Sequence, residues 1–298
     1  MNDICLLCSS KNYRFLGIKN HFNVVRCNIC SLTYIRPLPS KRSLEKLYEK
    51  FDYSNALVAE KVIRKDALES LIKIERFTRM RSLIDIGCGR GYFLDEARKR
   101  KWIVFGIDYS NEVIGYASKD LYLPVERADI FSFKSKRKFD VVTLNQVIEH
   151  VTQPNLLIEQ CNKLLNPGGL LYIATPNISS LLAKLKKLDF DYLMPPEHIG
   201  YYNYETLSRL LNDNGFTVLK CSFWSYSSDL AGLIKRLIKR KEGISLAKNK
   251  KKNTSALNYS LGKKLKHLLF DRFFCEIFYR VLNLRHWGTI IEIIAVKQ

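Results

Sequence analysis

The sequence has no apolar run approaching the ~18 to 20 residues that a membrane-spanning helix needs. Its first residues also lack the charged and apolar segments of a secretion signal, so we expect a cytoplasmic protein. Histidine is scarce, with five residues in 298, which leaves few candidates for proton transfer near neutral pH. Acidic side chains are outnumbered by basic ones, 29 to 49. With 47% hydrophobic residues, the chain can nevertheless bury a full core, and it fits one α/β domain with additions.

Half of the eight cysteines form two Cys-x-x-Cys pairs near the N-terminus. The pairs are Cys5 with Cys8 and Cys27 with Cys30, separated by eighteen residues. This spacing lets four thiolates surround one tetrahedral Zn²⁺, and the alternatives are a redox pair or chance spacing. We favour a structural zinc ribbon, because so short a segment could hardly fold on its apolar residues alone. Four thiolates would close the coordination sphere and leave no position for catalysis.

An apolar strand leads into a glycine turn that opens a helix, a pattern typical of a cofactor site. The turn is formed by Gly87, Gly89 and Gly91, which let the backbone approach a ligand closely. The next strand ends on Asp108, where a carboxylate could accept hydrogen bonds from both hydroxyls of a ribose. Asp85, before the first glycine, would repel a pyrophosphate but suits an amino acid's ammonium group. A nucleoside ligand is therefore expected, and a turn that serves only packing is the alternative.

In these residues the sequence resembles the class I S-adenosylmethionine-dependent methyltransferases, over residues 48–228 and the last strand. Further matches follow in the family's order at residues 127–130, 139–151 and 165–177. The resemblance implies an α/β fold with a Rossmann-like, doubly wound, seven-stranded sheet, whose antiparallel last strand inserts between the fifth and sixth. It also implies a set of residues that bind the methyl donor: Asp85, Gly87, Cys88, Gly89, Gly91, Asp108, Tyr109, Asp129, Ile130 and Asn145.

Four parts of the chain are expected from these patterns. A zinc ribbon spans residues 1–40, and a helical lid or linker spans 41–80. The donor-binding core comprises residues 81–228 and 288–298, with an insertion at 229–287.

The insertion carries 15 basic and 4 acidic side chains, more than half of the net charge of +20. It begins as a basic amphipathic helix, with apolar side chains at Leu233, Ile234, Leu237 and Ile238 and basic ones between them. One interpretation is contact with an anionic membrane surface or a lipid-linked, phosphorylated acceptor. The other is a solvated cap over the sheet, and the sequence leaves both open.

Two of the histidines are placed at the carboxyl edge of the expected sheet, where doubly wound folds bind ligands. His150 follows the fourth strand and His198 lies in the loop after the fifth, so both could face one pocket as an acid–base pair. Residues 147–151 resemble a segment of quinone-type and surface-glycan O-methyltransferases, which adds Glu149 to the catalytic candidates. The ubiquinone enzymes have two glutamates implicated in metal binding here, but Gln146 replaces the first, which argues against a catalytic metal. A purely structural role for both histidines is the alternative.

A zinc ribbon ahead of such a core is similar to sugar and small-molecule methyltransferases of bacterial surface-polysaccharide clusters. We therefore expect O-methylation of a sugar or lipid-linked glycan, in the cytoplasm or at the inner face of the membrane. A quinone or other aromatic hydroxyl is the second candidate acceptor. An RNA methyltransferase is the third, but nucleic acid is disfavoured because the core is nearly neutral and no aromatic residues interleave the lysines at 248–252.

Overall fold

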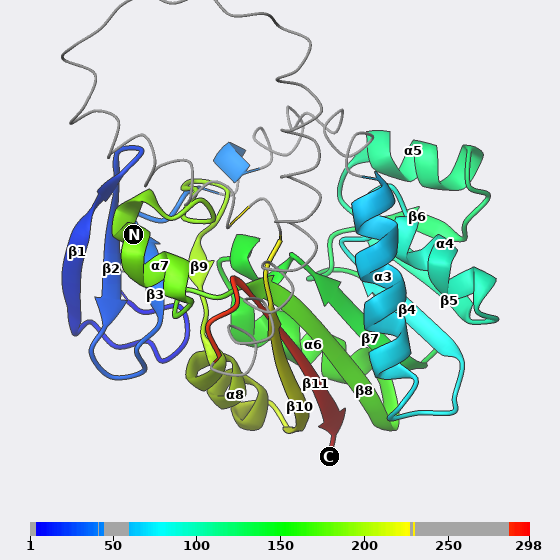
Figure 1. Ribbon diagram of the computed structural model, residues 1–298. Helices are drawn as coiled ribbons and strands as arrows, with labels where there is room; N and C mark the ends of the chain where they lie inside the picture. Colours follow the sequence, from blue (N-terminus) through cyan, green and yellow to red (C-terminus); the bar gives the residue numbers. More distant parts are fainter. Residues whose placement is uncertain (1–3, 41, 45–59, 227–228, 230–285) are drawn as a thin grey trace, which may run out of the picture.

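The computed structural model describes residues 4–40, 42–44, 60–226, 229 and 286–298 (Figure 1). Within these residues the chain forms a central sheet of seven strands and a second sheet of four strands beside it. Most of the expected insertion and part of the expected lid lie outside the described residues. The predictions made for these segments remain predictions.

The central sheet has the strand order β10-β11-β8-β7-β4-β5-β6. Neighbouring strands from β8 to β6 run parallel, whereas β11 is antiparallel to both β8 and β10. The expected fold class and the position of the last strand between the fifth and sixth are thus confirmed. The strands are β4 (Ser82–Ile86), β5 (Ile103–Asp108), β6 (Val125–Arg127), β7 (Phe139–Asn145), β8 (Leu165–Pro176), β10 (Phe216–Trp224) and β11 (Ile290–Lys297).

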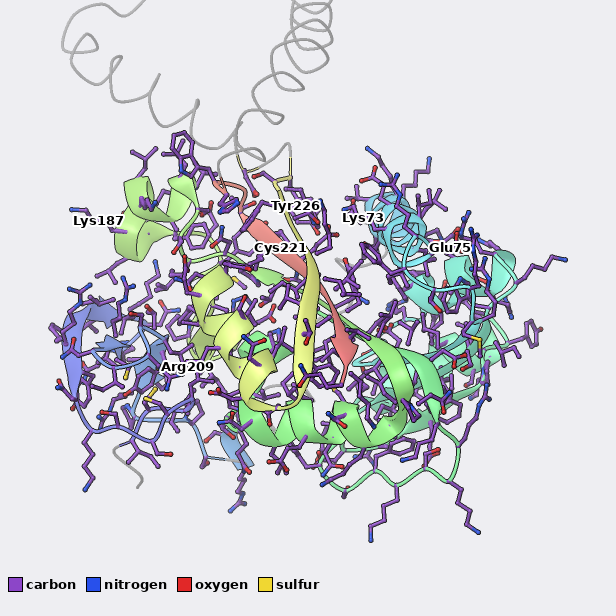
Figure 2. The ribbon with its side chains drawn as sticks, turned by 90° about the horizontal axis from the view of Figure 1, so that it is seen from below. Lys73, Glu75, Lys187, Arg209, Cys221 and Tyr226 are labelled. Atoms are coloured by element: carbon purple, nitrogen blue, oxygen red, sulfur yellow. The ribbon has the colours of Figure 1, made fainter. Side chains whose placement is uncertain are left out.

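Helices cover the sheet on both faces, which explains why the central strands are apolar throughout. On one face α3 (Glu60–Ile74), α4 (Tyr92–Lys99) and α5 (Asn111–Lys119) pack against alternate strand residues. On the other face lie α6 (Pro154–Leu164) and α8 (Tyr204–Asp213). In Figure 2, α3 with Lys73 and α8 with Arg209 accordingly lie on opposite sides of β10 and β11. The remaining helical elements are η1 (Ile148–His150), α7 (Leu181–Lys186) and η2 (Lys187–Asp189).

A buried carboxylate ties α3 to the sheet. Glu292 on β11 is only 3% exposed and accepts hydrogen bonds from the hydroxyls of Tyr172 at 2.8 Å and Ser222 at 3.2 Å. Ser70 and Lys73 reach the same carboxylate from α3. Because a buried charge is tolerated only when it is paired and hydrogen-bonded, these contacts fix α3 against the sheet.

The N-terminal segment forms the second sheet, in the order β1-β2-β3-β9. Its strands are β1 (Tyr13–Lys19), β2 (Phe22–Cys27), β3 (Thr33–Arg36) and β9 (Gly200–Tyr201). The fourth strand thus comes from the loop after β8, in the middle of the expected core. We did not foresee this pairing, because a two-residue strand leaves no periodic pattern in the sequence.

Strand β8 begins directly after α6. The segment from Leu165 to Gly169, with its proline and two glycines, forms the start of the strand. Residue Phe139 pairs with Leu165, and the register shifts before Val141 pairs with Leu170, so the glycines form an irregularity within the strand. No helix among the described residues has the length and apolar character needed to cross a membrane.

Candidate functional site

The glycine turn between β4 and α4 has the left-handed backbone that its sequence predicts. Gly87, Gly89 and Gly91 have φ angles of 71°, 52° and 78°, a region that strains other residues. A Cβ at Gly87 would lie 2.6 Å from a methyl group of Val147, so the turn packs against the segment that follows β7. A Cβ at Gly89 would meet no atom within 4 Å, so this part of the backbone faces open space where a ligand can approach.

Asp108 ends β5 directly beside this turn. Its carboxylate accepts hydrogen bonds at 2.9 Å from the backbone amides of Gly89 and Ser110. Burial raises the pKa of Asp108 above its ordinary value, although the backbone hydrogen bonds oppose that shift. A carboxylate held in this position beside an open glycine backbone fits the ribose hydroxyls of a nucleoside.

Asp85 lies at the carboxyl end of β4 and is 2% exposed. It accepts a hydrogen bond from Thr143 Oγ1 at 2.6 Å and one from Asn145 Nδ2 at 3.2 Å. Burial raises its pKa to about 7, with a smaller contribution from nearby Asp108. Because both hydrogen-bond donors are neutral, a cationic group would offset the cost of ionising Asp85. The residues present therefore fit a ligand that has an ammonium group as well as a ribose.

The other predicted donor-binding residues occupy two environments. The carbonyl oxygen of Tyr109 accepts a hydrogen bond from Arg127, whose guanidinium lies over the Tyr109 ring. Asp129 begins the turn after β6 and accepts a hydrogen bond from the amide of residue 131 at 3.0 Å. The side chains of Cys88 and Ile130 are instead buried in the core. A Cβ at Gly106 on β5 would lie 2.9 Å from the Cys88 sulfur and 2.5 Å from Leu94 of α4. The Cys88 thiol therefore packs between β5 and α4.

His150 and His198 are brought together from two loops, with their ring centroids 4.8 Å apart and nearly perpendicular. Each ring is fixed through Nδ1, by the carbonyl oxygen of Glu197 at 2.8 Å for His150 and by that of Tyr192 at 2.7 Å for His198. A carbonyl oxygen can only accept, so each neutral imidazole carries its proton on Nδ1. The Nε2 atom of each ring therefore has the lone pair that can take up a proton.

Both histidines are neutral at pH 7. Burial lowers the pKa of His150 below its ordinary value of 6.5. Burial and the neighbouring His150 together lower the pKa of His198 to about 3. Because a proton on His150 disfavours a second proton on His198, the pair takes up at most one proton in mildly acid solution.

Glu149 precedes His150 on η1 and is 1% exposed. Its Oε2 accepts a hydrogen bond from Thr175 Oγ1 at 2.8 Å, and burial raises its pKa to about 7. Within the part of the chain that the structure describes, its Oε1 has no hydrogen-bond partner. One carboxylate oxygen and one nitrogen from each histidine lie within 4.8 Å of one another, close enough for proton exchange or for a metal ion. Gln146 adds no carboxylate to this group, and we retain proton chemistry as our hypothesis.

Apart from Asn145, the sequence did not reveal the residues that hold these acidic and basic groups. One could have been found: Thr143 stands two positions before Asn145 on β7, so strand periodicity places both beside Asp85. Thr175 and the carbonyl oxygen of Tyr192 left no such signal. Thr175 lies on β8, 26 residues from Glu149, and Tyr192 contacts His198 through its backbone carbonyl, which any residue type carries.

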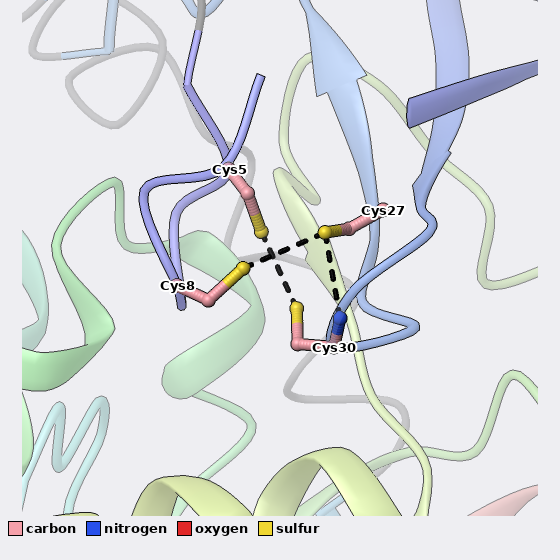
Figure 3. Close-up of side chains that lie close together, drawn as sticks. All are labelled: Cys5, Cys8, Cys27 and Cys30. Atoms are coloured by element: carbon pink, nitrogen blue, oxygen red, sulfur yellow. Dashed lines mark hydrogen bonds between the residues drawn. The ribbon is translucent and has the colours of Figure 1, made fainter. Parts of the chain in front are cut away.

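The four N-terminal cysteines gather at one point, as their spacing predicts (Figure 3). The sulfur atoms of Cys5 and Cys30 lie 3.5 Å apart, and those of Cys8 and Cys27 lie at the same distance. Zn–S bonds of about 2.3 Å place tetrahedral ligands about 3.8 Å apart, so the cluster fits Zn²⁺. The amide of Cys30 also points to the Cys27 sulfur. Both of these contacts cross between the two pairs and gather all four sulfur atoms at one point, which favours a shared metal ion over a redox Cys-x-x-Cys.

Together, the doubly wound sheet, the antiparallel β11 and the glycine turn with Asp108 define an α/β enzyme that binds a nucleoside cofactor. The family described as "Methyltransferase domain" matches residues 58–220, more than half of the chain, and the chain belongs to this family. It is therefore a methyltransferase. The family match does not include the four cysteines at the N-terminus.

The curated relatives include ubiquinone biosynthesis O-methyltransferases. The protein from Azoarcus sp. is 27% identical over 160 residues, which are 49% of this chain and 69% of that protein. The protein from Coxiella burnetii is 33% identical over 101 residues, 32% of this chain and 43% of that protein. This chain thus spans about two thirds of the first relative's length and less than half of the second's.

Solved structures agree on the fold. A possible histamine N-methyltransferase from Thermotoga maritima has a TM-score of 0.55 at 15% identity, covering 86% of this chain and all of that one. An S-adenosylmethionine-dependent methyltransferase from Archaeoglobus fulgidus has a TM-score of 0.51 at 20% identity, covering 82% of this chain and all of that one. At these identities the similarity concerns the fold alone.

Proposed function

We propose that the protein transfers a methyl group from S-adenosylmethionine to a hydroxyl group of a small-molecule acceptor. The observation that carries this proposal is the pair of neutral histidines beside the donor turn. Val147, which packs on Gly87, lies three residues before His150, so the turn and the base share one edge of the sheet. When bound, the donor supplies a methyl group already activated by its sulfonium.

The donor would be held by the chain's own acidic residues. Asp108 would accept hydrogen bonds from the ribose hydroxyls, and Asp85 would face the ammonium group of the methionine part. Asp129 would reach the adenine amino group, as the family resemblance implies. These contacts orient the donor, and orientation is the main contribution that a protein makes to transfer from an activated methyl group.

We assign the role of general base to His150. Its Nε2 would take the proton of the acceptor hydroxyl while Nδ1 continues to donate to the Glu197 carbonyl oxygen. The imidazolium formed would be stabilised by that carbonyl and by Glu149, one oxygen of which lies within 4.8 Å of a nitrogen of each histidine. His198, with its pKa of about 3, is too weak a base to hold a proton near neutral pH. We therefore propose that it orients the acceptor hydroxyl or His150.

Two classes of acceptor remain as proposals. A sugar or lipid-linked glycan hydroxyl is our first, resting on the resemblance of the ribbon and core to surface-polysaccharide methyltransferases. A quinone-type aromatic hydroxyl is the second, and the names of the curated relatives favour it. Both would present a hydroxyl proton to His150, so the chemistry of the base does not separate them.

We also propose that Cys5, Cys8, Cys27 and Cys30 hold one structural Zn²⁺. All four are donors of the type that zinc prefers, and no ligand position is left for water. Contact of the insertion with an anionic membrane remains a proposal from the sequence alone, because its basic helix lies outside the described residues.

An acceptor screen with methyl-labelled donor tests the proposed function. One set contains free and lipid-linked sugars, and the other contains dihydroxylated quinol precursors. Each acceptor is paired with an analogue whose hydroxyl is already methylated. We expect a methyl ether with one set and no transfer to its blocked analogues. A methylated nitrogen or carbon would contradict the proposal, and the productive set decides between the acceptor classes.

A further inference from the structure

The N-terminal sheet is completed by the loop that carries His198. Strand β9 pairs with β3, with Thr33 opposite Tyr201 and Tyr34 opposite Gly200. The amide of Ile35 also donates to the carbonyl oxygen of Ile199 at 3.1 Å. This loop is therefore a strand of the ribbon's own sheet as well as a part of the catalytic edge.

The opposite side of the same loop holds the catalytic group. The amide of Ile199 donates to the carbonyl oxygen of Glu149 at 2.7 Å. The carbonyl oxygen of Glu197 fixes Nδ1 of His150, and the hydroxyl of Tyr201 donates to the carbonyl oxygen of His198 at 2.8 Å. Residues 197–201 thus lie between β3 on one side and η1 on the other.

The cysteine cluster determines where β3 lies. Cys27 ends β2, and its amide donates to the carbonyl oxygen of Leu32 at 2.9 Å, directly before β3. The first cysteine pair is anchored to the core separately, because Asn155 on α6 donates to the carbonyl oxygen of Leu7 at 3.1 Å. Strand β1 is largely exposed, whereas Val25 and Tyr34 of β2 and β3 are buried against the core. Metal coordination would therefore add folding energy mainly at the turn between Cys27 and Cys30 that leads into β3.

A second contact joins the ribbon to this loop. Asn20, in the turn between β1 and β2, donates to the carbonyl oxygen of Pro195 at 2.8 Å. The donor-binding carboxylates are separate from these contacts, because the hydrogen bonds described for Asp85 and Asp108 all come from the central core.

From these contacts we propose that the zinc-bound ribbon is a positioning element of the active site, which holds the loop of residues 197–201 against His150. This inference rests on the proposed role of His150. It predicts that zinc controls turnover and leaves the affinity for the methyl donor unchanged.

The first experiment compares the zinc-loaded protein with the chelator-treated protein and with Cys27→Ser. Hydrogen exchange of the Ile199 amide reports the loop directly, and calorimetry with S-adenosylhomocysteine reports the donor site. We expect faster exchange at Ile199 and at least a tenfold loss of kcat, with donor Kd within about twofold. The acid limb of the pH–rate profile, where kcat falls as the base is protonated, should move to higher pH. A released His150 becomes more solvated, so its pKa rises back towards 6.5.

Loss of zinc could instead unfold the whole chain, so a milder pair of variants is needed. Asn20→Gly removes the contact with Pro195 and tolerates the backbone φ of 47° at this position. Asn28→Gly is the matched control, since the side chain of Asn28 donates to Asn12, another residue of the ribbon. Both should retain one zinc, and Asn20→Gly alone should lower kcat and shift the acid limb.

Unchanged Ile199 exchange after zinc removal would overturn the inference, as would equal kcat and pH profiles for Asn20→Gly and Asn28→Gly. The exchange measurement does not depend on the identity of the base. If His150 proves not to be the base, the exchange result still shows whether the ribbon holds the loop.

Discussion

Replacement of His150 by asparagine tests the proposed base while keeping its structural contact. The asparagine Nδ2 can take the place of the imidazole Nδ1 and donate to the Glu197 carbonyl oxygen, but no basic atom replaces Nε2. Loss of a general base costs about 10²- to 10⁴-fold in rate, equivalent to about 2.7 to 5.4 kcal/mol of transition-state stabilisation. Donor affinity should not change, because Asp85 and Asp108 are untouched.

The direction in which kcat changes with pH also follows from the proposed role of His150. The base acts in its neutral form, and burial lowers the pKa of His150 below 6.5. Wild-type kcat should therefore be constant above pH 6.5 and fall only in more acid solution, and this limb should be absent in His150→Asn. Protonation of the two buried histidines favours the unfolded chain, so stability should also fall as the pH drops below 6.5.

Rapid-quench or steady-state assays with the acceptor identified by the screen provide kcat. His21→Asn is the matched control, because His21 is exposed and takes part in none of the contacts described for His150 and His198. If His150→Asn kept kcat within threefold of wild type with its acid limb intact, the reasoning would be refuted. Methyl transfer would then depend on orientation alone.

Three further predictions concern the donor turn, the backbone and the insertion. Asp108→Ala removes a hydrogen-bonded carboxylate, so calorimetry should show a loss of about 1.5 to 3 kcal/mol in donor binding, about 10- to 150-fold in Kd; an unchanged Kd would remove Asp108 from the site. Gly91→Ala should lower the free energy of unfolding by at least about 1 to 2 kcal/mol in denaturant titrations, because its φ is 78° and the new Cβ would lie 2.5 Å from Leu123. A Cβ at Gly115, in α5, would meet no atom within 4 Å, so Gly115→Ala should instead raise the free energy of unfolding by about 0.4 to 1 kcal/mol. Equal effects of the two glycine substitutions would contradict the argument. Liposome sedimentation should show salt-sensitive binding to acidic vesicles that is lost when Lys235, Arg236, Lys239, Arg240 and Lys241 are reversed in charge; no binding at low salt would favour the cap interpretation.

The sequence predicted those parts of the fold that depend on local pattern. Strands β4 and β7 are apolar on both faces and bounded by turn residues, so their place in a parallel sheet could be inferred. The insertion of β11 between β8 and β10 came from family resemblance, because periodicity does not specify strand order. The pairing of β9 with β3 was missed, since it joins residues about 165 positions apart through only two residue pairs.

The candidate site was predictable to a similar degree. The glycines and Asp108 were recognisable because the turn requires positive φ and a carboxylate follows the next strand. Which nitrogen of His150 carries the proton depends on the carbonyl oxygen of Glu197, 47 residues away. Such long-range backbone contacts decide tautomers and pKa values, and no residue pattern encodes them.

Calorimetric titration of the wild-type protein with S-adenosylmethionine, and separately with NAD, tests the central claim most directly. Our account predicts one equivalent of the methyl donor bound per chain and no heat of binding with NAD, because Asp85 suits an ammonium group and repels a pyrophosphate. Tight binding of NAD with no binding of S-adenosylmethionine would contradict it.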